Sequence, residues 1–129
     1  MTGPGETTST SLFAKCLLRD GVLMAKLITP SIGQRESPII TQLIATELEA
    51  AGTANPPRAL VLDFSQVTFL NSMGLGMCID LRNRMAVIKG RVILYGVNTQ
   101  LLETLKLTKM DRLFTIVDDV KKLEAAVAR

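Results

Sequence analysis

The fold of this chain is decided by residues 60–77, which read LVLDFSQVTFLNSMGLGM. The stretch begins inside an apolar run, residues 59–62, that is too short for a helix. Because this run is apolar on both faces, it predicts a strand covered on both sides, as in a parallel sheet between helices. An amphipathic segment follows Asn71-Ser72 and continues to Lys89. We therefore expect a central strand with a helix after it.

The junction between this strand and the helix is marked by a small polar pair, Asn71 and Ser72. The side-chain oxygen of such a residue can accept hydrogen bonds from the free amides of the first helical turn, so the pair is an N-cap signal. We expect Ser72 to lie exposed at the positive end of the helix, where Gly74 and Gly76 leave room for another molecule to approach the backbone. On these grounds alone, Ser72 is best interpreted as a simple cap.

The same residues also resemble the signature of the STAS family, which comprises the anti-sigma factor antagonists and their relatives. The family's usual form is close to D-x-S-x-V-x-x-x-D-S-[ST]-G-L-G, and residues 63–76 read DFSQVTFLNSMGLG. A second string, LTKMDRLF at residues 107–114, is similar to the family's L-T-x-L-D-R-L-F ending. The resemblance covers roughly residues 12–127. It departs from the signature at Asn71, where Asp is usual, and at Met73, where Ser or Thr is common.

The resemblance implies a regulatory function. In the phosphoregulated branch of the family, the serine aligned with Ser72 is phosphorylated by a partner kinase that is also the anti-sigma factor. We therefore predict a non-enzymatic binding module that holds such a partner while Ser72 is free and releases it after phosphorylation. The predicted partner contacts are Asn71, Ser72, Met73, Gly74, Met77, Asp80 and Arg84.

Two alternatives stay open beside this prediction. Asn71 keeps the hydrogen-bonding shape of the usual Asp but lacks its charge, which favours either slower phosphorylation or constitutive docking in a sensor or transporter-associated assembly. Relatives in the family also bind lipid or nucleotide, so a small-ligand function is the second alternative. A weak homodimer is left open too.

Two other hydroxyls in the same stretch compete with Ser72 as phosphate acceptors. Ser65 directly follows the strand, where serine commonly forms local turn bonds. Thr68 lies between Val67 and Phe69, in a short run that we expect to pack against the sheet edge. Only Ser72 combines an exposed junction with a helix N-terminus, so we predict phosphorylation at Ser72 and not at the other two.

Length and composition predict one folded domain. The chain has 129 residues, 47% of them hydrophobic, and a formal net charge of only +3, which is enough chain for a core of its own. Residues 1–11 are rich in Gly, Thr and Ser and predict a disordered tail, so residues 12–129 form the expected domain. We expect no membrane span and no signal peptide. Cys16 and Cys78 lack disulfide-framework spacing, which favours a cytoplasmic location.

The absence of histidine excludes several classes of function. With no His in the sequence, the chain cannot form a Ser-His-Asp or Cys-His pair or a His-ligated zinc site. Gly74 and Gly76 do not form a phosphate-binding loop, because no Gly-Lys-Ser/Thr follows them. We therefore expect no catalysis, no metal and no cofactor. A loose basic cluster lacks aromatic residues and does not predict a nucleic-acid surface; its members are Arg82, Arg84, Lys89 and Arg91.

The remaining segments complete an α/β pattern. Residues 12–18 and 22–28 are predicted strands joined by an Asp-Gly turn, the strongest short hairpin signal. Ser37-Pro38 predicts the N-cap and first residue of a helix that stops at Gly52. Further elements are expected as a strand at 91–96, a short helix capped by Asn98, a strand at 113–117, and a helix opened by Asp118-Asp119 with Val120, Leu123 and Val127 inward.

This order, ββαβαβαβα, predicts a mixed β-sheet of about five strands covered by about four helices, with right-handed crossovers. On the helix after Ser72, an apolar stripe is expected to face the sheet; it comprises Leu75, Cys78, Leu81, Met85 and Ile88. Met73 and Met77 share a different face with Asp80 and Arg84. These two methionines fit either partial cover of the core or an adaptable partner surface.

Overall fold

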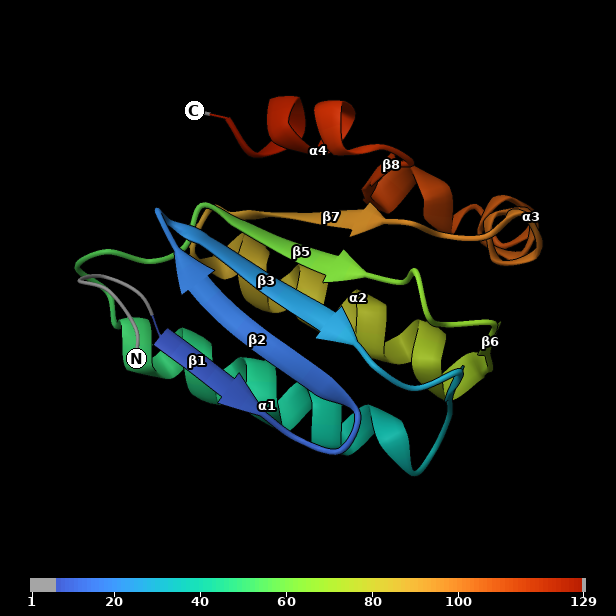
Figure 1. Ribbon diagram of the computed structural model, residues 1–129, viewed down its shortest axis with the longest axis horizontal. Coiled ribbons are helices and arrows are strands. Elements are labelled where there is room, and N and C mark those ends of the chain that lie inside the picture. The colour runs from blue at the N-terminus through green and yellow to red at the C-terminus, as the bar shows by residue number, and fades with distance from the viewer. Residues whose placement is uncertain (1–6, 129) are drawn as a thin grey trace.

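A six-stranded mixed sheet forms the centre of the molecule in the computed structural model, which describes residues 7–128 (Figure 1). Its strands are, in spatial order, β1 (Thr7–Thr10), β2 (Ala14–Arg19), β3 (Val22–Leu27), β5 (Ala59–Asp63), β7 (Arg91–Tyr95) and β8 (Thr115–Val117). The pairs β1–β2 and β2–β3 are antiparallel, and the other pairs are parallel. The predicted mixed α/β architecture is confirmed.

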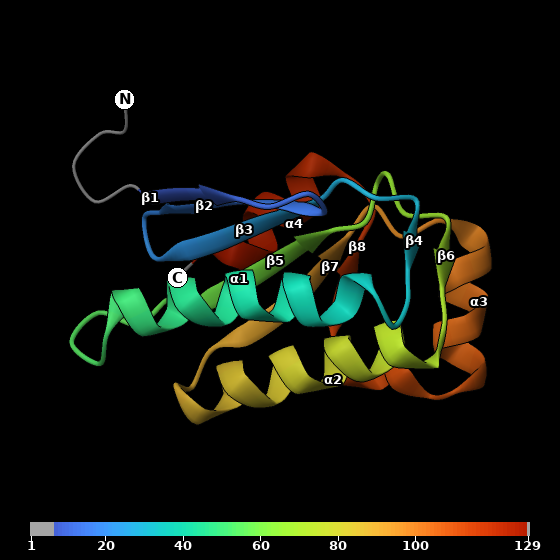
Figure 2. The same ribbon diagram turned by 90° about the horizontal axis from the view of Figure 1, so that it is seen from below.

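Helices cover the two faces of this sheet unequally. Within residues 7–128 they are α1 (Glu36–Ala51), α2 (Ser72–Val87), α3 (Thr99–Leu107), the 3-10 helix η1 (Met110–Leu113) and α4 (Val120–Val127). Figure 2 shows α1 and α2 against one face and α4 on the other. It also shows α3 at one end of the sheet, the same end at which the short parallel pair β4 (Ser31–Ile32) and β6 (Phe69–Leu70) lies. None of the helices in this described part is long and apolar enough to span a membrane.

The central strand β5 divides the apolar residues between two cores. Leu60 and Leu62 belong to the larger cluster, under α1 and α2, while Val61 belongs to the smaller cluster, under α4. This division follows from the alternation of side chains along a strand. All three residues have no exposed surface, which confirms the predicted strand covered on both faces.

The predicted apolar stripe of α2 also faces the larger cluster. Cys78, Leu81 and Met85 are fully buried, and Leu75 and Ile88 pack against the same cluster while remaining partly exposed. The helical spacing in the sequence therefore assigned the correct side of α2 to the sheet.

The hairpin between β2 and β3 has the predicted Asp-Gly turn. Asp20 has a φ of 53° and Gly21 a φ of 78°, and Arg19 pairs with Val22 across the turn. Positive φ at both central residues is the requirement of the two-residue turn that matches the twist of the strands. Asp and Gly adopt this conformation at lower cost than most residues, so the sequence signal and the structure agree.

Strand β1 lies in the stretch that was expected to be a disordered tail. Residues 1–6 of that expected tail lie outside the described residues, but Thr7–Thr10 pair with β2 from Thr7 opposite Leu18 to Thr10 opposite Lys15. A segment of Gly, Thr and Ser buries little apolar surface by itself, which is why its composition predicts disorder. Threonine nevertheless suits strands, and β2 offers an unpaired edge for hydrogen bonding.

Helix α1 begins earlier than the Ser37-Pro38 signal predicted. Glu36 is the first helical residue, its carboxylate accepts a hydrogen bond from the Gly33 N–H at 2.9 Å, and Ser37 lies inside the helix. Its hydroxyl oxygen is buried and has no hydrogen-bond partner among the described residues. The prediction that Ser37 caps α1 is therefore wrong. The predicted stop at Gly52 is confirmed, since Gly52 has a φ of 71° there.

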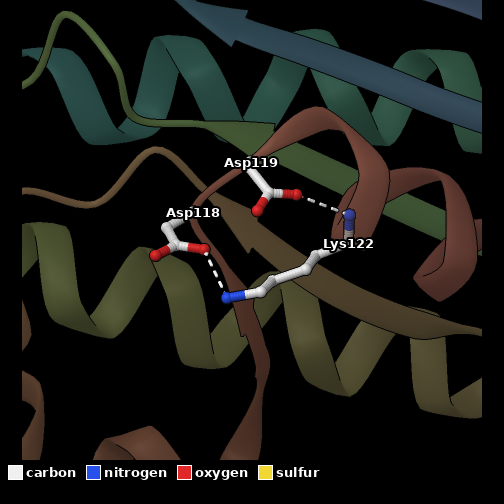
Figure 3. A network of polar contacts seen from close by, with 3 residues as sticks. All are labelled: Asp118, Asp119 and Lys122. Atoms are coloured by element: carbon white, nitrogen blue, oxygen red, sulfur yellow. Dashed lines mark hydrogen bonds and ion pairs between the residues drawn. The ribbon is translucent and has the colours of Figure 1, made fainter.

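The start of α4 combines a cap and an ion pair (Figure 3). Asp119 accepts a hydrogen bond from the Lys122 N–H at 2.7 Å, and the Lys122 ammonium lies 3.0 Å from Asp118. Hydrogen bonding between the two side chains is the main cause that lowers the pKa of Asp118 and raises that of Lys122. The predicted opening of this helix is confirmed. Leu123 and Val127 pack on the smaller cluster, but Val120 is exposed rather than inward.

Candidate functional site at the start of helix α2

The N-terminus of α2 is capped by Asn71 and not by Ser72. The Asn71 side-chain oxygen accepts hydrogen bonds from the Met73 N–H at 2.9 Å and the Gly74 N–H at 3.1 Å. Ser72 is the first helical residue and is exposed. The interpretation of Ser72 as the cap is therefore wrong, and its hydroxyl takes no part in closing the helix end.

The position of Asn71 is fixed by the small sheet of β4 and β6. The Asn71 N–H donates to the carbonyl of Ile32, and a Cβ on Gly33 would lie only 2.9 Å from the Asn71 side-chain nitrogen. A Cβ on Gly74 would lie 2.3 Å from Leu70 and 2.7 Å from the Ile32 carbonyl oxygen. Gly74 is buried, so it supports the site from beneath.

The two methionines predicted on one face have different environments. Met73 is 49% exposed, whereas Met77 is 3% exposed and belongs to the larger core. Of the two readings of this face, core cover applies to Met77 and a surface position to Met73. Further along the helix, Asp80 and Arg84 form an exposed ion pair of 3.0 Å, a kind of pair that contributes little to stability.

A groove of about 420 Å³ opens beside Ser72, between the first turns of α1 and α2. From α2 it is lined by Ser72, Met73, Gly76, Met77 and Asp80, and from α1 by Ser37, Pro38, Thr41 and Gln42. The partnerless buried hydroxyl of Ser37 lies among these residues. An exposed, adaptable methionine and an open glycine are suitable features for docking another protein.

The α1 side of this groove was missing from the predicted contacts. Pattern analysis assigns each helix its sheet-facing side, but it does not state which exposed sides of two helices lie next to each other. The one available signal was the βαβ order, because right-handed crossovers between strands added in one direction place their helices on the same face of the sheet. That signal would have directed attention to the exposed first turn of α1.

The three hydroxyls of the signature stretch are now distinguishable. Thr68 donates its hydroxyl to the Pro30 carbonyl at 3.0 Å and is exposed rather than packed on the sheet edge. Ser65 is also exposed, and its backbone N–H is bonded to Asp63 at 2.9 Å, which is the expected local turn bond. Ser72 alone of the three lies at a helix N-terminus and lines a groove.

The cysteines do not offer a nucleophile to this site. Cys16 and Cys78 are both free and buried, and burial raises the pKa of each thiol to about 12. Each sulfur is thus kept as the unreactive thiol near neutral pH. Within residues 7–128 no group of three or more acidic, Cys or His side chains is placed to hold a metal ion.

The fold and this site together define a small α/β domain that presents a serine at the start of a crossover helix. The family model for the STAS domain matches residues 18–123. The match covers most of the sequence, so the chain belongs to the STAS domain family and the predicted resemblance is confirmed. A comparison with curated proteins gives no match.

Several solved structures share this fold. An anti-sigma factor antagonist from Mycobacterium paratuberculosis is 23% identical with a TM-score of 0.72, covering 98% of both chains. An anti-sigma-factor antagonist (STAS) domain protein from Planctomyces limnophilus is 19% identical with a TM-score of 0.73, covering 89% of this chain and 97% of the other. The phosphorylated form of the Bacillus cell fate determinant SpoIIAA is 12% identical with a TM-score of 0.65, covering 96% and 99%.

Proposed function

We propose that this protein is a non-enzymatic regulator of the anti-sigma factor antagonist type. It acts in the cytoplasm, in the control of transcription, and binds an anti-sigma factor that is also a serine kinase. Phosphorylation of Ser72 releases that partner. The observation that carries the proposal is the position of Ser72, which is exposed at the first residue of α2 and lines the groove between α1 and α2.

The groove indicates how the partner binds. We place the contact surface on Ser72, Met73 and Gly76 of α2 and on Pro38 and Gln42 of α1, which all line the groove. The Asp80–Arg84 ion pair is exposed at the rim. Of the contacts predicted from the sequence, Asn71, Gly74 and Met77 then act indirectly, since they close the helix end or pack beneath it.

A phosphate on Ser72 is compatible with the folded domain. It adds roughly −1.5 to −2 charge at the positive end of a helix, where a negative charge is stabilised by the helix dipole. The Asn71 cap already satisfies the Met73 and Gly74 amides, so the phosphate does not need to replace an existing bond. The phosphate instead weakens the complex with the partner, because it adds charge and volume to the surface where the partner docks.

Asn71 maintains the geometry of this site without adding a charge to it. Asn and Asp are similarly effective as N-caps, and Asn71 makes both capping bonds. A phosphate on Ser72 is therefore not repelled by a carboxylate at the preceding residue. The departure from the family signature accordingly leaves the acceptor site intact.

The experiment is a pull-down from a lysate of the source cells, with wild-type protein, Ser72→Ala and Ser72→Asp as baits. We expect wild type and Ser72→Ala to capture the same kinase-related partner and Ser72→Asp to lose it. Ser65→Asp is the matched control, because Ser65 is exposed in the same stretch but does not line the groove. Equal capture by all baits would instead indicate the constitutive docking module.

A further inference from the structure

A second hollow lies far along α2 from Ser72 and is lined by three arginines. It measures about 250 Å³ and is bounded by α2, the turn before β7, and the segment from η1 to β8. The arginines are Arg82, Arg91 and Arg112, and neither Asp nor Glu occurs among the lining residues. No carboxylate lines the hollow, so the charges of Arg82 and Arg112 are not neutralised within it.

Two of these arginines are held in place by backbone carbonyls. Arg82 donates its Nε–H to the Leu113 carbonyl at 3.1 Å. Arg91 donates to the carbonyls of Ala126 and Ala128, at the end of α4. A guanidinium carries five N–H donors, so each arginine keeps donors that these bonds do not use. The carbonyls orient the groups but do not neutralise their charge.

Arg112 completes the group from the other side of the hollow. It lies in η1, is exposed, and has no hydrogen-bond or ion-pair partner among residues 7–128. Thr115, at the start of β8, also borders the hollow. Planar guanidinium groups bind the oxygens of phosphate in paired hydrogen bonds, so this lining suits an oxyanion better than a neutral or cationic molecule.

The end of α2 does not oppose an anion at this position. A helix C-terminus is partly negative because its last carbonyls lack partners. Here the Met85 carbonyl accepts from the Ile88 and Gly90 N–H groups, and the Ala86 carbonyl accepts from the Lys89 N–H. These turn bonds satisfy the carbonyls of Met85 and Ala86, so fewer unpaired acceptors face the arginines.

We propose that this hollow binds the phosphate group of a small anion, with Arg82 and Arg112 as the principal ligands. The site is separate from the Ser72 groove, shares no lining residue with it, and does not depend on the regulatory function proposed above. The phosphate is either free inorganic phosphate or the phosphate of a small ester, and both present the same oxygens to the arginines.

The test is a titration followed by ¹H–¹⁵N NMR, with inorganic phosphate in one arm and adenosine monophosphate in the other, at ionic strength matched with sodium chloride. We expect saturable shifts of the amides of Gly90 and of residues 112–115, absent in sodium chloride alone. Saturation only by the monophosphate ester would identify an ester as the source. Equal affinity in both arms would identify the phosphate group itself. No saturable shift in either arm overturns the proposal.

Three single variants assign the binding to the hollow. Arg112→Gln removes no hydrogen bond and is expected to weaken binding at least tenfold without changing the melting temperature. Arg82→Gln is expected to weaken binding similarly, although it also loses the bond to Leu113. Arg84→Gln is the control, since it removes the same charge from α2 but lies outside the hollow and pairs with Asp80. Equal weakening by Arg84→Gln would show only a general charge effect and contradict the site.

Discussion

The first turns of α2 have a buried side and an exposed side with opposite properties. On the buried side, Met77 and Cys78 are 3% and 0% exposed and pack in the larger core. On the exposed side, Ser72 and Met73 line the groove with α1. The same helix thus anchors the domain and holds the proposed partner surface in position. We therefore expect substitutions on the buried side to change stability and substitutions on the exposed side to change partner binding.

The largest expected effect is a charge on the buried side. Cys78→Asp should lower the free energy of unfolding by about 3 to 5 kcal/mol, because it buries a carboxylate without a partner. Ile79→Asp is the control on the next residue, which is 36% exposed, and should cost far less. Urea denaturation measures the free energy of unfolding of both variants. If Cys78→Asp unfolds at the wild-type denaturant concentration, the assignment of the buried side is wrong.

The two methionines test the comparison directly, because they carry the same side chain but Met77 is buried and Met73 is exposed. Met77→Lys should cost roughly 2 to 4 kcal/mol of unfolding free energy, through lost packing and a poorly solvated ammonium. Met73→Lys should change stability by no more than about 0.5 kcal/mol but weaken partner binding at least tenfold, about 1.4 kcal/mol. Calorimetric melting and titration with the partner separate the effects. Tight binding by Met73→Lys would remove Met73 from the partner surface.

The two glycines give the smallest and most precise contrast. Gly74→Ala places a methyl group 2.3 Å from Leu70 and should destabilise by about 1 to 3 kcal/mol. At Gly76 a Cβ would meet nothing within 4 Å, so Gly76→Ala should stabilise the helix by roughly 0.5 to 1 kcal/mol. Gly76 lines the groove, and the added methyl should still reduce partner affinity. Destabilisation by both variants would mean that Gly76 is not on an open surface.

The sequence predicted well those features that depend on local patterns. The apolar run of β5, the stripe of α2 and the Asp20-Gly21 turn each depend on the spacing or conformation of nearby residues. The helix starts were less certain, because Asn71 and Ser72 are both good caps, as are Ser37 and other small polar residues. Asn71 rather than Ser72 caps α2 because the pairing of β4 with β6 fixes the position of Asn71.

The groove could not be predicted from a local pattern, because its lining residues belong to two separate helices. Its two sides come from α1 and α2, which are far apart in the chain and meet only in the folded domain. The burial of Met77 is a similar case. A helical pattern places Met77 beside Met73 on one face, but the position of α1 decides that one is covered and the other is not.

The most direct test of the central claim is to phosphorylate the protein with its candidate kinase and ATP, locate the phosphate by mass spectrometry, and titrate the modified protein with the partner. We expect one phosphate on Ser72, a melting temperature that is unchanged or slightly raised because the helix dipole adds up to ~1 kcal/mol of stabilisation, and at least a tenfold loss of partner affinity, about 1.4 kcal/mol. A phosphate on Ser65 or Thr68 would contradict the site. A phosphate on Ser72 that leaves partner affinity unchanged would contradict the switch.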